Sequence, residues 1–112
     1  MVALQKIPAP EVLHLFIEHL RGERRLAEKT CEAYQRDISE FLGFLAGYLD
    51  TDITLPEIVG VETRGFRAYL AQRRRGNRPL SAASIQRQLS AVRTFYRYIE
   101  RRWDAALSLI HI

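Results

Sequence analysis

The sequence has few of the residues on which several classes of protein depend. Cys31 is the only cysteine, so neither a disulfide framework nor a thiolate metal cluster can form within the chain. No apolar run approaches the roughly 20 residues that a membrane helix requires. The N-terminus also lacks the charged, apolar and small-residue pattern of an export signal. These absences predict a protein of the reducing cytoplasm that neither crosses a membrane nor binds one.

The residues expected of an independent enzyme are also scarce. The chain has no glycine-rich nucleotide loop and no plausible nucleophile with a base beside it. His14 and His19 are five residues apart and do not share a helix face, and His111 lies near the C-terminus. We therefore expect no catalytic residue, no metal, no cofactor and no small-molecule substrate.

Basic residues exceed acidic ones, 17 to 13, which gives a net charge of +4 and a pI near 9.6. Lys6 and Lys29 are the only lysines, so 15 of the 17 basic residues are arginine. Arginine donates through a planar fork that suits phosphate and guanine. The composition favours a polyanionic partner, although an arginine-rich proteome would produce the same excess.

The apolar residues recur at helical spacing, and no alternating run of β-branched residues predicts a strand. At 112 residues the chain is long enough for one domain. We predict an all-α domain of four main helices, with a short turn near residues 55–58. The expected helices run from near Pro10 to Gly22, from about Glu28 to Leu49, from about Glu62 to Arg75, and from a cap at Ser81 or Ser84 to about Trp103.

The last of these helices, in LSAASIQRQLSAVRTFYRYIERRW, separates apolar from basic residues when projected at about 100° per residue. The apolar stripe holds Ile85, Leu89, Val92, Tyr96, Ile99 and Trp103. The opposite arc holds Gln86, Arg87, Ser90, Arg93, Thr94, Arg97 and Arg101, with no acid. A solvated face usually mixes signs, because Glu and Arg four residues apart stabilise a helix. The arc favours nucleic-acid contact, while a solvated face or a protein interface remains open.

Two blocks of the sequence carry a resemblance to a known family. The first block, LAEKTCEAYQRDISEFLGFL, matches at Leu26, Thr30, Tyr34, Asp37, Phe41 and Leu45. The second block, SIQRQLSAVRTFYRYI, matches at Ser84, Ile85, Arg87, Leu89, Ser90, Arg93, Phe95 and Tyr96. With the intervening FRAYLAQRRRGNRPLS, the chain resembles the N-terminal core-binding, SAM-like domain of tyrosine recombinases of the Xer and phage-integrase type over about residues 12–102. It departs at Ala27, where the family usually has a capping serine, and after Trp103.

The resemblance implies an orthogonal bundle of four main helices that forms one half of a clamp on double-stranded DNA. In the family, a tyrosine of a separate catalytic domain attacks a phosphodiester and forms a 3′-phosphotyrosyl link. The resemblance therefore implies a DNA-binding domain for recombination or integration that supports protomer assembly but does not cut DNA alone. It does not distinguish a chromosome-dimer resolvase, which would serve chromosome partition, from a phage or integron integrase.

The resemblance also implies particular DNA contacts from the second and fourth helices. The implied contacts are Lys29, Thr30, Gln35 or Arg36, Gln86, Arg87, Ser90 and Arg93. From their positions in the sequence, Arg25, Arg75, Thr94 and Arg97 are possible supports to the DNA backbone. We expect residues 1–103 to form the domain and residues 104–112 to be a tail or an altered C-terminal end. The alternative is a helical interaction module that binds an acidic protein.

Several other residues have a structural interpretation that competes with a functional one. Tyr34 and Tyr96 lie on apolar faces, which favours packing over DNA contact. Cys31 is expected to be a small buried residue. The run Arg73 to Arg75 stands at a helix end, where cations suit the helix dipole, although a supporting phosphate contact is also compatible.

Overall fold

The computed structural model describes residues 4–75 and 81–104. Its helices within these residues are α1 (Ala9–Gly22), α2 (Glu28–Leu49), α3 (Leu55–Val59), α4 (Thr63–Arg74) and α5 (Ala82–Trp103). The prediction of an all-α fold is confirmed, and the expected turn near residues 55–58 is the short helix α3. The predicted loop from Gly76 to Pro79 and the segment 105–112 lie outside the described residues.

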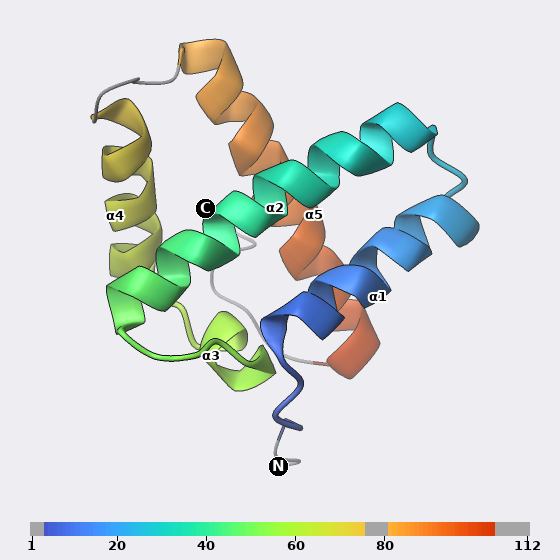
Figure 1. Cartoon of the computed structure of the whole chain (residues 1–112), viewed down its shortest axis with the longest axis horizontal. Helices are drawn as coiled ribbons and strands as arrows, with labels where there is room; N and C mark the ends of the chain where they lie inside the picture. The colour runs from blue at the N-terminus through green and yellow to red at the C-terminus, as the bar shows by residue number, and fades with distance from the viewer. Residues whose placement is uncertain (1–3, 76–80, 105–112) are drawn as a thin grey trace.

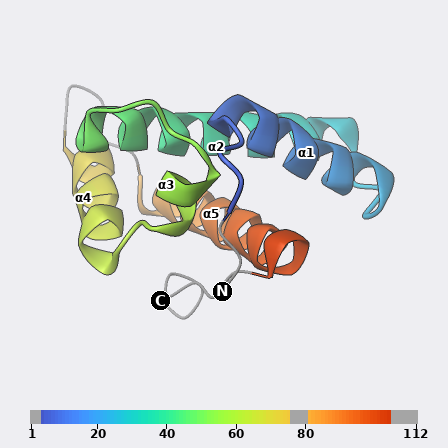
Figure 2. The same cartoon turned by 90° about the horizontal axis from the view of Figure 1, so that it is seen from below.

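The helices form two layers. α1 and α2 run in opposite directions as a hairpin, and α2 passes across α5 (Figure 1). Viewed from below, α1 and α2 make one layer, α5 lies beneath them, and α4 stands at one end (Figure 2). α2 is the central element because it contacts α1, α4 and α5.

The ends of the helices follow from local hydrogen bonding. Ser81 is the cap of α5, and its hydroxyl accepts a hydrogen bond from the Ser84 amide at 3.1 Å. α2 begins after Ala27, whose methyl side chain cannot accept a hydrogen bond, so this helix has no side-chain cap. Thr54 and Glu57 form a capping box at α3. α2 stops at Asp50, whose left-handed conformation, φ 52°, ends the helix.

Aromatic rings pack together in the core between the two layers. Phe16 of α1 meets Phe95 of α5 with 5.2 Å between ring centroids, and Phe41 of α2 meets Tyr69 of α4 at 5.1 Å. Cys31 is buried, as expected. Edge-to-face ring pairs at these separations are the favoured arrangement. The apolar face of α2 therefore joins three other helices into one core.

The apolar stripe of α5 differs in detail from the one expected. Leu89 and Trp103 are only half-buried, whereas Gln88 and Phe95 are buried. Leu49, the last residue of α2, is 40% exposed although it is apolar. The buried face of α5 is wider than a single stripe because α5 packs against more than one neighbour.

Tyr96 is buried in the core and joins α5 to α3. Its hydroxyl donates a hydrogen bond to the Ile58 carbonyl at 2.7 Å. Burial raises the pKa of this hydroxyl far above its usual value, so Tyr96 stays protonated. The expectation that Tyr96 packs with its hydroxyl on a polar group is confirmed.

No helix of the described residues is both long and apolar enough to cross a membrane.

We predict that Tyr96→Phe lowers the free energy of unfolding by about 1 kcal/mol, because the buried ring stays in place while one hydrogen bond is removed. Urea denaturation followed by circular dichroism measures this change. Tyr48→Phe is the matched control, since Tyr48 is 44% exposed and should shift stability by less than about 0.5 kcal/mol. Equal stability of Tyr96→Phe and wild type would show that the bond to Ile58 contributes nothing.

Candidate nucleic-acid interface

A groove of about 350 Å³ lies between the N-terminal halves of α2 and α5. It is lined by Lys29, Thr30, Ala33, Tyr34, Asp37, Arg87, Ser90 and Ala91. Four of these, Lys29, Thr30, Arg87 and Ser90, are residues for which the sequence predicts DNA contact. The crossing of α2 over α5 therefore brings together predicted contacts that are about 60 residues apart in the chain.

An ion pair joins the two walls of this groove. The Arg87 Nε donates to Asp37 Oδ2 at 3.2 Å, and Arg87 Nη2 donates to Asp37 Oδ1 at 3.1 Å. The Asp37 side chain is only 3% exposed, whereas that of Arg87 is 50% exposed. A carboxylate this enclosed needs an opposing charge and hydrogen-bond donors, and Arg87 supplies both.

A second polar group lies beside this pair, where α2, α4 and α5 meet. The buried Gln88 donates from Nε2 to Glu40 at 2.8 Å and accepts from the Tyr69 hydroxyl at 3.1 Å. Arg73 reaches the same Glu40 carboxylate at 3.3 Å, and its guanidinium lies over the Tyr69 ring. Burial raises the pKa of the Tyr69 hydroxyl, and Arg73 opposes that rise. Arg73 therefore has a structural partner within the fold.

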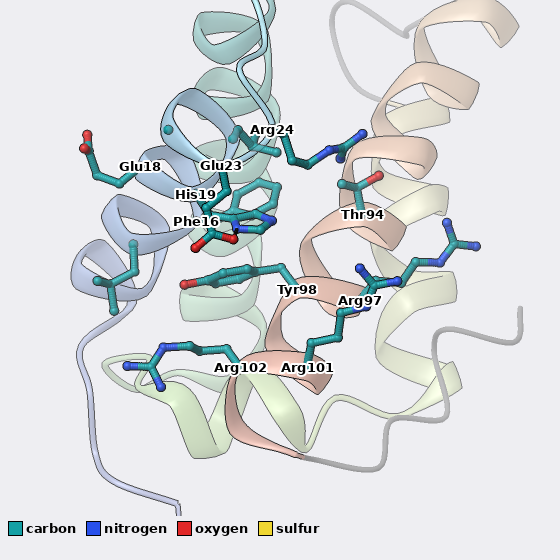
Figure 3. Close-up of a pocket in the computed structure, with 13 residues that line it drawn as sticks. Phe16, Glu18, His19, Glu23, Arg24, Thr94, Arg97, Tyr98, Arg101 and Arg102 are labelled. Carbon is teal, nitrogen blue, oxygen red and sulfur yellow. Dashed lines mark ion pairs between the residues drawn. The ribbon is translucent and has the colours of Figure 1, made fainter.

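A larger groove of about 890 Å³ separates the C-terminal halves of α1 and α5. Figure 3 shows Arg24, Thr94, Arg97 and Arg101 gathered on one side of it, while Arg102 points the other way. Tyr98 occupies the middle, with its ring centroid 4.9 Å from that of His19.

The two grooves share the basic face of α5, whereas Glu18 and Glu23 also line the larger groove and Asp37 lines the smaller one. Ser90, in the first groove, precedes Thr94, in the second, by one helical turn. Within the described residues, Arg93, Arg97 and Arg101 have no carboxylate within ion-pair distance, whereas Arg87 does. Three of the four arginines in the predicted arc therefore have no ion-pair partner among the described residues.

Two predicted contacts on α5, Gln86 and Arg93, line neither groove. Gln86 is exposed and Arg93 is half-buried on α5. On α2, Arg36 lies about 20° from Lys29 around the helix axis and Gln35 about 120° away, at 3.6 residues per turn. Of the two alternatives, Arg36 therefore shares the flank of the groove.

Two predicted backbone supports stand at helix ends. Arg25 is exposed in the link between α1 and α2, where it adopts a left-handed conformation with φ 52°. Arg75 is exposed and ends α4. Neither residue lines either of the two grooves.

In the described part of the chain, no group of three His, Cys, Asp or Glu residues is placed to hold a metal ion.

Sequence patterns alone assign no functional role to Asp37 or to Gln88. Both polar residues stand on otherwise apolar faces, Asp37 between Tyr34 and Phe41, and Gln88 between Ile85 and Val92. A polar residue in that position signals a buried network, because an isolated polar group is costly to bury. The partners could not be read from one helix at a time, since Asp37 and Arg87 are 50 residues apart.

The structure is an all-α domain in which α2 crosses α5 and a row of arginines runs along α5. The comparison with known families is more specific. Residues 13–103 match the family described as "Phage integrase, N-terminal SAM-like domain". The chain belongs to this family, and the resemblance to tyrosine recombinases is confirmed.

Curated relatives carry the name tyrosine recombinase XerC. The chain is 40% identical over 104 residues to that of Rhizobium meliloti (strain 1021), covering 90% of this chain and 32% of the relative. It is 38% identical over 86 residues to that of Nitrobacter winogradskyi, covering 77% of this chain and 26% of the relative. The chain thus spans about a quarter to a third of the length of these relatives. No solved structure shows significant similarity to the chain.

We predict that Gln88→Ala lowers the free energy of unfolding by about 2 kcal/mol, because it leaves the buried Tyr69 hydroxyl without its acceptor and opens a small cavity. Gln86→Ala is the matched control two residues earlier on the same helix, where the side chain is exposed, and it should cost less than about 0.5 kcal/mol. The midpoints of urea denaturation measure both. Equal midpoints for the two variants would contradict a stabilising role for the Gln88 network.

Proposed function

We propose that this chain is the DNA-binding, N-terminal domain of a tyrosine site-specific recombinase. The observation that carries the proposal is the basic face along α5, where Arg93, Arg97 and Arg101 have no acidic partner among the described residues. Such a surface neutralises DNA phosphates and releases their counterions. The family match and the recombinase names of the relatives support the same assignment.

The proposed role is to position duplex DNA rather than to cut it. α2 and α5 lie against one side of the duplex, and residues 1–103 form this half of a clamp. Tyr69 and Tyr96 are buried and hydrogen-bonded in the core, which makes them unsuitable as nucleophiles toward a phosphodiester. Cleavage and strand exchange would belong to a catalytic domain that closes on the opposite side.

The wider role follows from the same proposal. Other recombinase protomers would be the protein partners, since strand exchange joins several protomers on DNA. Because the relatives are named XerC, we propose a role in chromosome partition, which would place the protein in the cytoplasm. Integration of mobile DNA is the competing role within the same family.

The α1/α5 groove favours a second candidate function. Its lining includes the half-buried Leu15 and Tyr98, together with Arg24, Arg97, Arg101 and Arg102, which outnumber the acidic Glu18 and Glu23. This combination suits an acidic protein segment with an apolar anchor. A module of this kind would bind acidic peptides and would have no salt-dependent affinity for duplex DNA beyond that of any protein with the same net charge.

We predict that the chain binds duplex DNA with strong salt dependence. If about five phosphates are neutralised, log affinity should fall with log salt concentration at a slope between about −4 and −5. Fluorescence anisotropy of a labelled duplex at several salt concentrations measures the slope. Absence of salt-dependent binding at high protein concentration would reject the proposed function.

We predict that Arg93→Ala with Arg97→Ala weakens duplex binding and lowers the magnitude of the salt slope by about 2, because two fewer phosphates are neutralised. Neither arginine pairs with a carboxylate of the described residues, so the helical circular dichroism signal should not change. Arg87→Ala is unsuitable for this test, because it leaves the buried Asp37 carboxylate without its positively charged partner and would also lower the stability of the fold.

The matched control is Arg64→Ala with Arg67→Ala, which removes the same charge from exposed positions of α4. This control should keep the wild-type slope. If both double variants changed affinity and slope equally, binding would depend on net charge alone and the assigned face would be incorrect.

A further inference from the structure

The Arg87–Asp37 pair has a geometry that leaves part of the arginine available. Asp37 accepts from Nε and from Nη2, which is the side of the guanidinium. A guanidinium has five N–H donors in one plane, and side-on pairing uses two of them. The end of the fork, with both N–H groups of Nη1 and the second of Nη2, has no partner among the hydrogen bonds of the described residues.

The surroundings make this free end both fixed and accessible. Asp37 lies on the buried face of α2, so its carboxylate has little room to move. The Arg87 guanidinium that it binds is therefore held in one orientation. Half of the Arg87 side chain is exposed. The lining of the groove around it combines the larger Lys29 and Tyr34 with three small residues, Ala33, Ser90 and Ala91, and the small residues leave room for a flat group to approach. Arg87 is therefore a directed donor, whereas a solvated arginine would sample many rotamers.

We propose that Asp37 is a positioning residue that aims Arg87 at a guanine edge in the major groove of the bound duplex. The proposal rests on the proposed function, because it requires that α2 and α5 face DNA. The guanine N7 and O6 atoms form a pair of acceptors that matches the end of an arginine fork. The pair would supply base preference, while the other arginines of α5 supply affinity for the DNA backbone.

The charges favour a base edge over a phosphate for this arginine. Asp37 lies within 3.2 Å of the guanidinium and offsets its charge, so Arg87 contributes little to the neutralisation of phosphates. Arg93, Arg97 and Arg101 have no such partner in the described residues and are better suited to phosphates. A guanine edge is a neutral acceptor pair that gains from direction more than from net charge.

The first test uses the wild-type chain. Duplexes are selected from a randomised pool and sequenced, and we expect a guanine to be enriched at one position. That guanine is then replaced by 7-deazaguanine, which keeps base pairing and backbone charge but lacks the N7 acceptor. We expect affinity to fall at least about fivefold, the lower end for removal of a good arginine–guanine pair. Unchanged affinity would overturn the guanine contact.

The second test asks whether Asp37 acts through Arg87. Asp37→Asn keeps the shape but removes the charge and one acceptor, and Arg87→Lys keeps the charge but removes the fork. Both should lose the preference for guanine over 7-deazaguanine while retaining salt-dependent binding of duplex. Arg67→Lys is the control, because Arg67 is exposed on α4 and lines neither groove, and it should keep the preference. Retention of the full preference in folded Asp37→Asn would overturn the positioning role.

These experiments separate the two proposals. Duplex binding with the expected salt slope but no dependence on N7 overturns the guanine contact and leaves the proposed function intact. Complete absence of duplex binding overturns both. Circular dichroism and urea denaturation establish that each variant is folded. If Asp37→Asn does not fold, the wild-type measurement with 7-deazaguanine and the Arg87→Lys variant still decide whether Arg87 reads guanine.

Discussion

The packing of α2 across α5 is the contact on which the rest of the structure depends. α2 also contacts α1 and α4, so its apolar face anchors both layers of the bundle. The same crossing forms the groove in which predicted DNA contacts from two distant segments meet. Because burial of apolar surface is non-directional, it brings the helices together without defining their register. The hydrogen bonds of Asp37 and Gln88 are directional and link α2 to α5 and α5 to α4 at particular residues.

These polar groups link stability to the proposed interface. Asp37 is buried and Arg87 is half-exposed, so one ion pair extends from the core to the surface. Gln88, one residue further along α5, faces inward and bonds to α2 and α4. Of these two neighbours on α5, Arg87 reaches the proposed interface and Gln88 bonds to other helices in the core. A change at Arg87 affects both stability and binding, whereas a change at Arg93 or Arg97 is expected to affect binding with little effect on stability.

The arginines of α5 are not equivalent, although they share one arc. A carboxylate accompanies Arg87, while Arg93, Arg97 and Arg101 lack one within the described residues. Uncompensated arginines attract a polyanion over a distance of about a Debye length and give affinity with little regard to base sequence. An arginine held by a carboxylate loses much of that long-range attraction, but its N–H donors point in a fixed direction. The proposed division of roles along one helix would combine affinity for DNA with selectivity.

Much of this protein could be predicted from the sequence because helices are local. The 3.6-residue period placed α2 at about Glu28–Leu49, the hydroxyls of Ser81 and Ser84 marked two alternative starts of α5, and the acid-free arc followed from one helix alone. The family was recognisable from two such blocks. Tertiary structure decided which arginine is paired, why Gln88 is buried, and that Leu49 is exposed. Those outcomes depend on contacts between helices, such as that of Asp37 with Arg87 across 50 residues, and no pattern within a single helix contains them.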